Sequence, residues 1–219
     1  MGKDEAKTMT DEERELFRLI VPLAKLVTGK QGVGVASEVL EAFGGAGYIE
    51  DTGLPRLLRD AQVLPIWEGT PNVLSLDILR VLSRGGSLDP LEREVRRCVQ
   101  NAPTSLKPAA DVALGAVAHA KAWVMETMGN GGPSAVEQGA RRFALTLGRS
   151  LELAFLVDHA TWAEGRGDVS HAAAARLFAR TAVDQILDGY AGSDARDLVG
   201  GAPIRGRRRC PRARFRAAA

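Results

Sequence analysis

The sequence predicts an all-α fold, a helical bundle followed by a helical extension, and three observations support this prediction. Apolar residues make up 45% of the 219 residues and aromatic residues only 5%, while alanine and leucine, which favour helices, are abundant. Apolar residues recur at three- and four-residue spacing through most of the chain, which is typical of helices with one buried face. Runs of β-branched residues are scarce, and we find no convincing strand.

The first helix is expected to begin at Thr10, which forms a T-x-x-E capping box with Glu13. Leucine, isoleucine and valine residues then repeat at helical spacing, and Pro22 is expected to kink the helix. The same periodicity continues over residues 33–43, and the glycine pair at 44–45 ends it.

Periodicity weakens over residues 46–69, where a short helical turn is expected at 56–61. Thr70 and Pro71 then start another helix, with threonine as the N-cap and proline at the first helical position. Four further helices are predicted, beginning at Asp89-Pro90, at Lys107-Pro108, at a second capping box of Ser134 and Glu137, and at Ser170. They are expected to end near Val99, near Met128, near Ala163 and, after an apolar stripe, at Tyr190.

The composition and residue spacing exclude several classes of protein. No stretch approaches the roughly 18 uninterrupted apolar residues of a membrane helix, and the N-terminus is charged, so we expect a cytoplasmic protein without a membrane span. Cys98 and Cys210 lie far apart, which argues against a disulfide framework. Neither the cysteines nor His119, His159 and His171 have ligand-like spacing, so no metal site is expected.

Positive charge is concentrated in the last residues of the chain. Seven arginines follow residue 204, and without them the net charge of +2 would be −5. Clustered arginines attract nucleic-acid phosphates, so the tail is either a nucleic-acid-binding arm or a disordered end. We favour the disordered end. The bias toward Arg, Pro and Ala also resembles out-of-frame translation of GC-rich DNA.

Residues 41–82 carry the features that suggest chemistry. Gly44, Gly45 and Gly47 would let a backbone approach a ligand closely, yet the same glycines also suit a helix end and a turn. Glu68 directly precedes a helix N-terminus, where the dipole stabilises a carboxylate. Partial burial beside Trp67 would make it a stronger base, which suits proton abstraction. From these residues alone, the structural and functional interpretations both stay open.

The order of the motifs in this segment closely resembles the C-terminal signature of acyl-CoA dehydrogenases. Gly-Gly-x-Gly-Tyr is followed by Arg-Asp-Ala and then by an aromatic-Glu-Gly-Thr that leads into a helix. The version IWEGTPNVLSLDILRVL is most similar to the AidB-like subgroup of that family. The resemblance is strong over residues 10–85 and rests on a helical extension over residues 86–190.

This resemblance implies roles for individual residues. In the family, the glutamate of the motif is the catalytic base that removes the proton α to a thioester, a role that falls on Glu68. Gly69 matches a position close to the acyl-CoA substrate. The cofactor implied is FAD, and the matching positions are Thr70, Asn72, Gly44 and Gly45, the glycines often reaching the FAD of a neighbouring subunit. Arg59 of the Arg-Asp-Ala motif matches a structural or peripheral position.

The resemblance also divides the chain into three parts. Residues 1–86 are expected to be part of the acyl-CoA dehydrogenase C-terminal helical domain, residues 87–191 a helical extension, and residues 192–219 a disordered basic tail. Nothing resembles the N-terminal helical domain or the β-rich middle domain of the family, so we expect the chain to be incomplete as an enzyme.

An incomplete bundle exposes apolar surface, so we expect a homo-oligomer or a partner chain that carries the missing domains. Two alternatives to the dehydrogenase role remain open. One is an AidB-like flavoprotein part associated with nucleic acid in the alkylation response. The other is a catalytically inert helical oligomerisation fragment.

Overall fold

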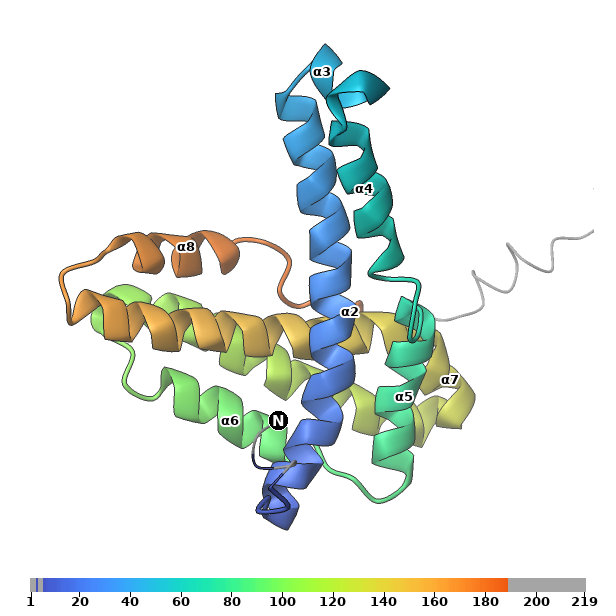
Figure 1. Ribbon diagram of the computed structural model, residues 1–219. Coiled ribbons are helices and arrows are strands. Elements are labelled where there is room, and N and C mark those ends of the chain that lie inside the picture. The colour runs from blue at the N-terminus through green and yellow to red at the C-terminus, as the bar shows by residue number, and fades with distance from the viewer. Residues whose placement is uncertain (1–2, 4–5, 189–219) are drawn as a thin grey trace, which may run out of the picture. The chain divides into compact units, whose positions relative to one another are not determined.

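A computed structural model describes residue 3 and residues 6–188 of the chain. Over these residues every regular element is a helix, which confirms the predicted all-α fold (Figure 1). The elements in chain order are α2 (Asp11–Ala42), α3 (Gly45–Tyr48), the 3-10 helix η1 (Glu50–Thr52), α4 (Leu54–Val63), α5 (Pro71–Ser83), α6 (Asp89–Val99), the 3-10 helix η2 (Thr104–Leu106), α7 (Lys107–Glu164) and α8 (Ser170–Phe178).

Helix α2 begins with the predicted capping box. The hydroxyl of Thr10 accepts a hydrogen bond from the backbone N–H of Glu13 at 3.2 Å, and the Glu13 carboxylate accepts from the N–H of Thr10 at 3.0 Å. The helix continues through Pro22 as one element. Its buried residues all lie between Leu19 and Gly29, so only this part of α2 packs into the core.

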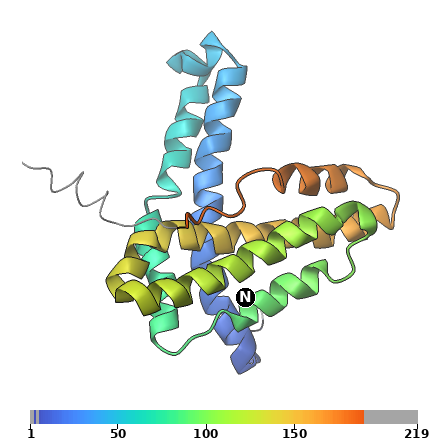
Figure 2. The same cartoon turned by 180° about the vertical axis from the view of Figure 1, so that it is seen from behind.

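The element α7 is a hairpin of two helical arms. Gly132 separates the arms with φ +66° and ψ −168°, a backbone conformation that suits glycine. The arms run back along each other (Figure 2), and the rings of Trp123 and Phe143 meet between them with centroids 5.6 Å apart. The predicted capping box of Ser134 is wrong, because Pro133, whose fixed φ suits a first helical turn, already begins the second arm.

The last predicted helix is shorter than expected. It ends at Phe178, and residues 181–186 leave the helical path because α7 supplies tertiary hydrogen bonds to their backbone. The hydroxyl of Thr146 accepts from the N–H of Gln185 at 2.9 Å, and Arg149 donates to the carbonyl of Ala182 at 3.0 Å. The predicted stripe up to residue 190 is therefore wrong over these residues, and its last position, Tyr190, lies outside the described residues.

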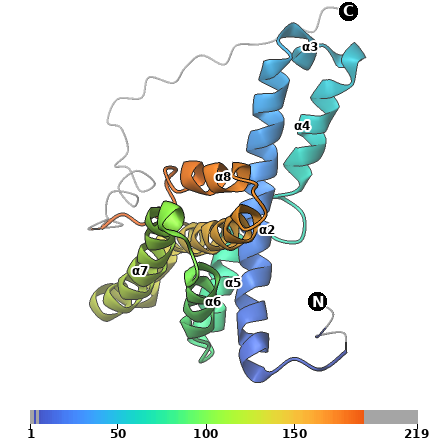
Figure 3. The ribbon, with the colours of Figure 1, turned by 90° about the vertical axis from the view of Figure 1, so that its left-hand side faces the viewer.

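The hydrophobic core lies between α5, α6, α7, α8 and the first part of α2, as the views in Figures 1 and 3 show. The largest fully buried side chains include Phe143, Leu19, Leu23, Leu26, Ile78, Leu91, Leu106, Leu147 and Leu153. A polar contact also joins α2 to the second arm of α7, since the amide of Gln31 donates to both carboxylate oxygens of Glu152 at 2.7 and 2.8 Å.

The rest of α2 forms a hairpin with α4 that extends away from this core (Figure 1). We call residues 30–63, which comprise the end of α2, α3, η1 and α4, the α2–α4 hairpin. Gly47 is the one buried residue within this range. Helix α4 has no buried residue, and large apolar side chains of the hairpin are exposed, among them Val35, Phe43, Tyr48, Ile49 and Leu57. The two long helices of the hairpin therefore pack against each other, and their other faces are largely exposed.

The predicted disordered tail at 192–219, together with its nucleic-acid interpretation, lies outside the described residues. No helix in the described part of the chain combines the length and apolar character needed to cross a bilayer.

Candidate functional site

The loop that joins α4 to α5 carries the predicted catalytic residue. The carbonyl of Val63 accepts hydrogen bonds from the N–H groups of Ile66 and Trp67 at 2.9 and 3.1 Å, which closes the end of α4 into a turn. Glu68 follows with φ +53°, and Gly69 with φ +113°. A non-glycine residue in the left-handed region costs about 1–2 kcal/mol, so the surrounding structure must hold Glu68 in this conformation.

The Glu68 side chain is exposed, and no hydrogen bond or ion pair joins it to another described residue. The expected burial beside Trp67 is absent in this chain, because Trp67 is itself 60% exposed. The physical reason is that α2 lies on one side of the loop and no described segment covers the other. The backbone N–H of Glu68 also makes no hydrogen bond among the described residues.

Helix α5 begins as predicted, with Thr70 at the N-cap and Pro71 at the first helical position. The Thr70 side chain makes no capping hydrogen bond, so the backbone N–H groups of the first turn, including that of Asn72, keep their capacity to bind an anion. Thr70 and Asn72 are both exposed. This helix end therefore fits the negatively charged pyrophosphate of a dinucleotide such as FAD.

The glycine turn at the far end of the hairpin serves the fold in two different ways. Gly44 has φ +56°, which suits glycine, and Gly45 begins α3. At Gly47 an added Cβ would lie 2.0 Å from the carbonyl oxygen of Leu40, so this glycine lets α3 fold back on α2. Gly47 therefore allows a close approach to the backbone of its own chain, whereas the sequence suggested a close approach to a ligand. Gly44 and Gly45 face open space.

The structure brings the predicted site residues together in two groups. Glu68, Gly69, Thr70 and Asn72 lie on consecutive turns at the base of the hairpin, whereas the glycine turn lies beside α3 at its other end (Figure 1). Helix α4 has 10 residues and separates the groups by roughly 15 Å at about 1.5 Å per residue. The two groups therefore lie at opposite ends of the hairpin.

Arg59, which the resemblance matches to a structural or peripheral position, makes its contacts within the α2–α4 hairpin. Its guanidinium donates to both carboxylate oxygens of Glu50 at 2.8 and 3.0 Å, and this hydrogen bonding lowers the pKa of Glu50. The pair ties α4 to η1.

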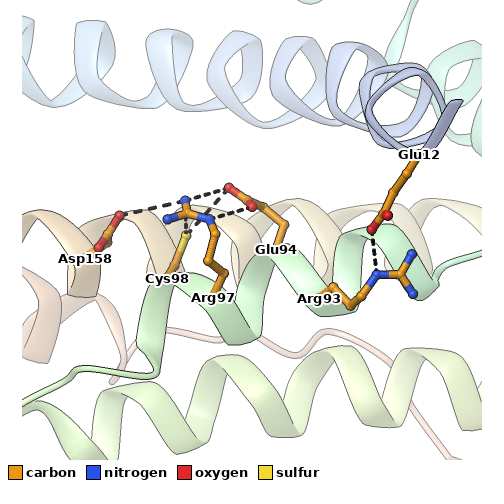
Figure 4. A network of polar contacts seen from close by, with 6 residues as sticks. All are labelled: Glu12, Arg93, Glu94, Arg97, Cys98 and Asp158. Carbon is orange, nitrogen blue, oxygen red and sulfur yellow. Dashed lines mark hydrogen bonds and ion pairs between the residues drawn. The ribbon is translucent and has the colours of Figure 1, made fainter. Parts of the chain in front are cut away.

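The sequence analysis did not anticipate a polar network between α6 and α7 (Figure 4). Arg97 donates to both oxygens of Glu94 at 2.8 Å and lies 3.9 Å from a carboxylate oxygen of Asp158. Cys98 lies beside this pair and is 2% exposed. Burial, and after it the neighbouring Glu94 carboxylate, raises the pKa of the Cys98 thiol to about 12, so the thiol is protonated and unreactive at neutral pH.

A second feature that the sequence did not indicate lies on the outer face of α7. Phe155, Asp158, His159 and Trp162 line an open pocket of about 410 Å³. The His159 ring stacks on Trp162 and meets the edge of His171. Within the described part of the chain, no group of three or more histidine, cysteine or acidic residues is arranged to hold a metal ion.

Comparisons with known proteins agree with the all-α fold and with the resemblance to acyl-CoA dehydrogenases. Residues 2–83 match the family described as "Acyl-CoA dehydrogenase, C-terminal domain", and residues 87–184 match "Acyl-CoA dehydrogenase 11 C-terminal domain-like". Acyl-CoA dehydrogenase family member 11 of Caenorhabditis elegans is 42% identical over 167 residues, which cover 74% of this chain and 27% of that protein. Putative acyl-CoA dehydrogenase AidB of Escherichia coli is 48% identical over 67 residues, 31% of this chain and 12% of that protein.

A solved structure extends the comparison. The crystal structure of Caenorhabditis elegans ACDH-11 in complex with C11-CoA has a TM-score of 0.81 and 35% identity to this chain, and the match covers 91% of this chain and 35% of that one. The chain therefore spans about a third or less of the length of these relatives.

Proposed function

Because residues 2–83 and 87–184 correspond to the C-terminal regions of acyl-CoA dehydrogenases, we propose that the chain is the C-terminal helical part of an FAD-dependent enzyme that dehydrogenates acyl-CoA thioesters. It acts together with polypeptide that supplies the rest of the site. The segment IWEGTPNVLSLDILRVL supports a place beside AidB-like proteins within this family.

One observation carries the catalytic part of this proposal. The Glu68 carboxylate is exposed, has no partner among the described residues, and is held at a left-handed backbone position just before α5. A structural carboxylate at a helix start is expected to cap the helix or pair with a cation, and Glu68 does neither. Its freedom suits a base that meets its substrate only in the assembled enzyme.

The proposed reaction needs only Glu68 and its immediate neighbours from this chain. The thioester makes the α-proton acidic, and the Glu68 carboxylate accepts this proton. A bound FAD would accept the β-hydrogen as a hydride, so that a double bond forms between the α and β carbons. The free N–H of Glu68 donates a hydrogen bond to the thioester oxygen as negative charge develops there. Gly69, without a side chain, lets the acyl-CoA approach.

The cofactor contacts divide between two copies of the chain. Thr70 and Asn72 would hold the pyrophosphate at the N-terminus of α5, where orphan N–H groups and the helix dipole favour an anion. Gly44 and Gly45 lie at the other end of the hairpin, and they would contact the cofactor of a neighbouring subunit. Closing the site in this way also covers Glu68 and Trp67.

The test is turnover of the chain assembled with the remaining domains of an acyl-CoA dehydrogenase. Glu68→Gln is expected to lower turnover at least a thousandfold while leaving the flavin bound, because an amide does not accept the proton. Glu38→Gln is the matched control, since Glu38 is an exposed carboxylate on α2 remote from the loop. Turnover of Glu68→Gln at the rate of Glu38→Gln would exclude Glu68 as the base.

A specific observation also favours a role in assembly. The α2–α4 hairpin exposes Phe43, Tyr48, Ile49 and Leu57 on a segment in which only Gly47 is buried. Apolar surface of this extent is typical of an interface. We therefore infer that the hairpin associates with a second copy or with the chain that carries the missing domains.

Sedimentation of the isolated chain tests this second role. Replacing both Phe43 and Leu57 with serine is expected to shift the chain toward monomer, because the two side chains are more than half exposed. Met125→Ser, which removes a 70% exposed apolar side chain from α7, is the control and should leave association unchanged. A monomeric wild-type chain, with flavin-loaded assembly also unaffected by the double substitution, would contradict the role.

A further inference from the structure

A single lysine on α2 holds the loop that presents Glu68. The Nζ atom of Lys25 donates to the backbone carbonyls of Leu64 at 3.2 Å, Trp67 at 2.6 Å and Gly69 at 3.3 Å. Two of these carbonyls belong to the residues on either side of Glu68. Three acceptors on one ammonium group use all three of its donors.

These contacts explain how the loop keeps its unusual backbone. Glu68 and Gly69 have consecutive positive φ angles, a combination that turns the chain sharply. The turn points the carbonyls of Trp67 and Gly69 toward the same place, where they would repel each other without a cation. The Leu64 carbonyl lies at the C-terminal end of α4, where the helix dipole also favours positive charge. The positive charge of Lys25 therefore offsets the partial negative charges of three carbonyl oxygens that lie close together.

The surface of α2 is shaped to receive the loop at this place. Gly29 and Gly32 follow Lys25 by one and two turns on the same face of the helix. A Cβ on Gly29 would meet the backbone of Leu64 and Pro65 at 3.4–3.5 Å, and a Cβ on Gly32 would meet the Leu64 side chain at 3.1 Å. The two glycines let the loop lie against α2, within reach of the ammonium group.

We infer that Lys25 is a positioning residue for Glu68: its three hydrogen bonds fix the backbone around the base and so set the direction of the carboxylate. This inference rests on the proposed role of Glu68. It assigns a function to Lys25, which lies 43 positions before Glu68 and outside the aromatic-Glu-Gly-Thr motif.

Hydrogen exchange of the isolated full-length chain tests the structural half of this inference. Lys25→Met keeps the apolar stem of the side chain and removes the donors, so the hydrogen-bonded amides of Leu64, Ile66 and Trp67 are expected to exchange about tenfold faster or more. The control is Lys30→Met, which removes an exposed ammonium of the same helix that donates to none of these carbonyls. Lys25→Arg is expected to lie between the two, because a planar guanidinium cannot direct three donors at one point. Equal exchange in all variants would overturn the inference.

Turnover of the assembled dehydrogenase tests the functional half. Lys25→Met is expected to lower kcat at least tenfold with KM and flavin content near wild type, and Lys25→Arg should recover part of kcat. A Lys25→Met variant with faster loop exchange but wild-type kcat would overturn the positioning role and leave Glu68 as the base. Wild-type turnover of Glu68→Gln would instead overturn the proposed base itself, whatever Lys25 does.

Discussion

Phe43 and Phe143 are the same side chain in two regions that are packed very differently. Phe143 is 0% exposed and lies between the arms of α7, whereas Phe43 is 55% exposed near the far end of the α2–α4 hairpin. The region after residue 87 forms the core together with α5 and the first part of α2. The hairpin, whose two ends carry the proposed site residues, does not. The difference teaches that the proposed site residues lie beside an open apolar surface and outside the packed core.

The strongest test of this contrast is a matched pair of phenylalanine substitutions. Phe143→Ala is expected to lower the free energy of unfolding by about 3–5 kcal/mol, because it leaves a cavity between Trp123 and the rest of the core. Phe43→Ala should change it by less than about 0.5 kcal/mol in the isolated chain. Urea unfolding followed by circular dichroism measures both, and similar losses would remove the contrast.

Two glycines of α7 sharpen the contrast where α2 joins the core. A Cβ on Gly148 would lie 2.5 Å from Cγ2 of Val27, whereas a Cβ on Gly115 would meet nothing within 4 Å. Gly148→Ala is therefore expected to cost about 1–3 kcal/mol through overpacking. Gly115→Ala should stabilise the chain by about 0.5–1 kcal/mol through helix propensity. Thermal unfolding of the two variants should shift in opposite directions, and a shared direction would show that the seam is loosely packed.

The buried thiol of Cys98 should make the free energy of unfolding depend on pH. Burial raises the pKa of its thiol from 9.0 to about 12, so above pH 9 the folded chain keeps a proton that the unfolded chain loses. The free energy of unfolding should therefore fall as pH rises from 9 to 12, by about 1.4 kcal/mol per pH unit more than in Cys98→Ala. Urea titrations of both proteins at several pH values measure this difference. Parallel pH profiles would show that the thiol is solvated in the folded state.

The smallest effect is expected within the hairpin. Arg59→Ala removes an exposed ion pair with Glu50 and should leave the free energy of unfolding nearly unchanged, because solvent screens exposed charges. The pKa of Glu50, which hydrogen bonding from Arg59 lowers, should return toward its ordinary value, as a carboxyl titration by NMR would record. A loss comparable to that of Phe143→Ala would mean that the hairpin is part of the cooperative core.

Local signals were sufficient to predict most helix starts. Thr10 with Glu13, and the prolines at 71, 90 and 108, act within one turn of the chain, so their effect can be read from neighbouring residues. Residues 181–186 could not be predicted in the same way. Their helical spacing is overruled by hydrogen bonds from Thr146 and Arg149, which are distant in sequence.

The candidate site was predictable as a motif but not as a geometry. The position of Glu68 before α5 follows from Thr70 and Pro71, whereas its exposure depends on which segments pack around the loop in three dimensions. The role of Lys25 was also invisible, because its hydrogen bonds go to backbone carbonyls 39–44 residues away, which any residue type provides. The one available signal was a lysine between Leu23 and Leu26, in the part of α2 whose leucines are buried.

The contact between Gln31 and Glu152 has a consequence for biosynthesis. The two residues are 121 positions apart, so a ribosome that adds about 5–20 residues per second needs on the order of ten seconds to deliver the second after the first. During this time α2 has left the ribosome before the arms of α7 that cover Leu19, Leu23 and Leu26 exist. The nascent chain therefore exposes these leucines until α7 has been made, and slowing elongation between the codons of Gln31 and Glu152 should increase misfolding.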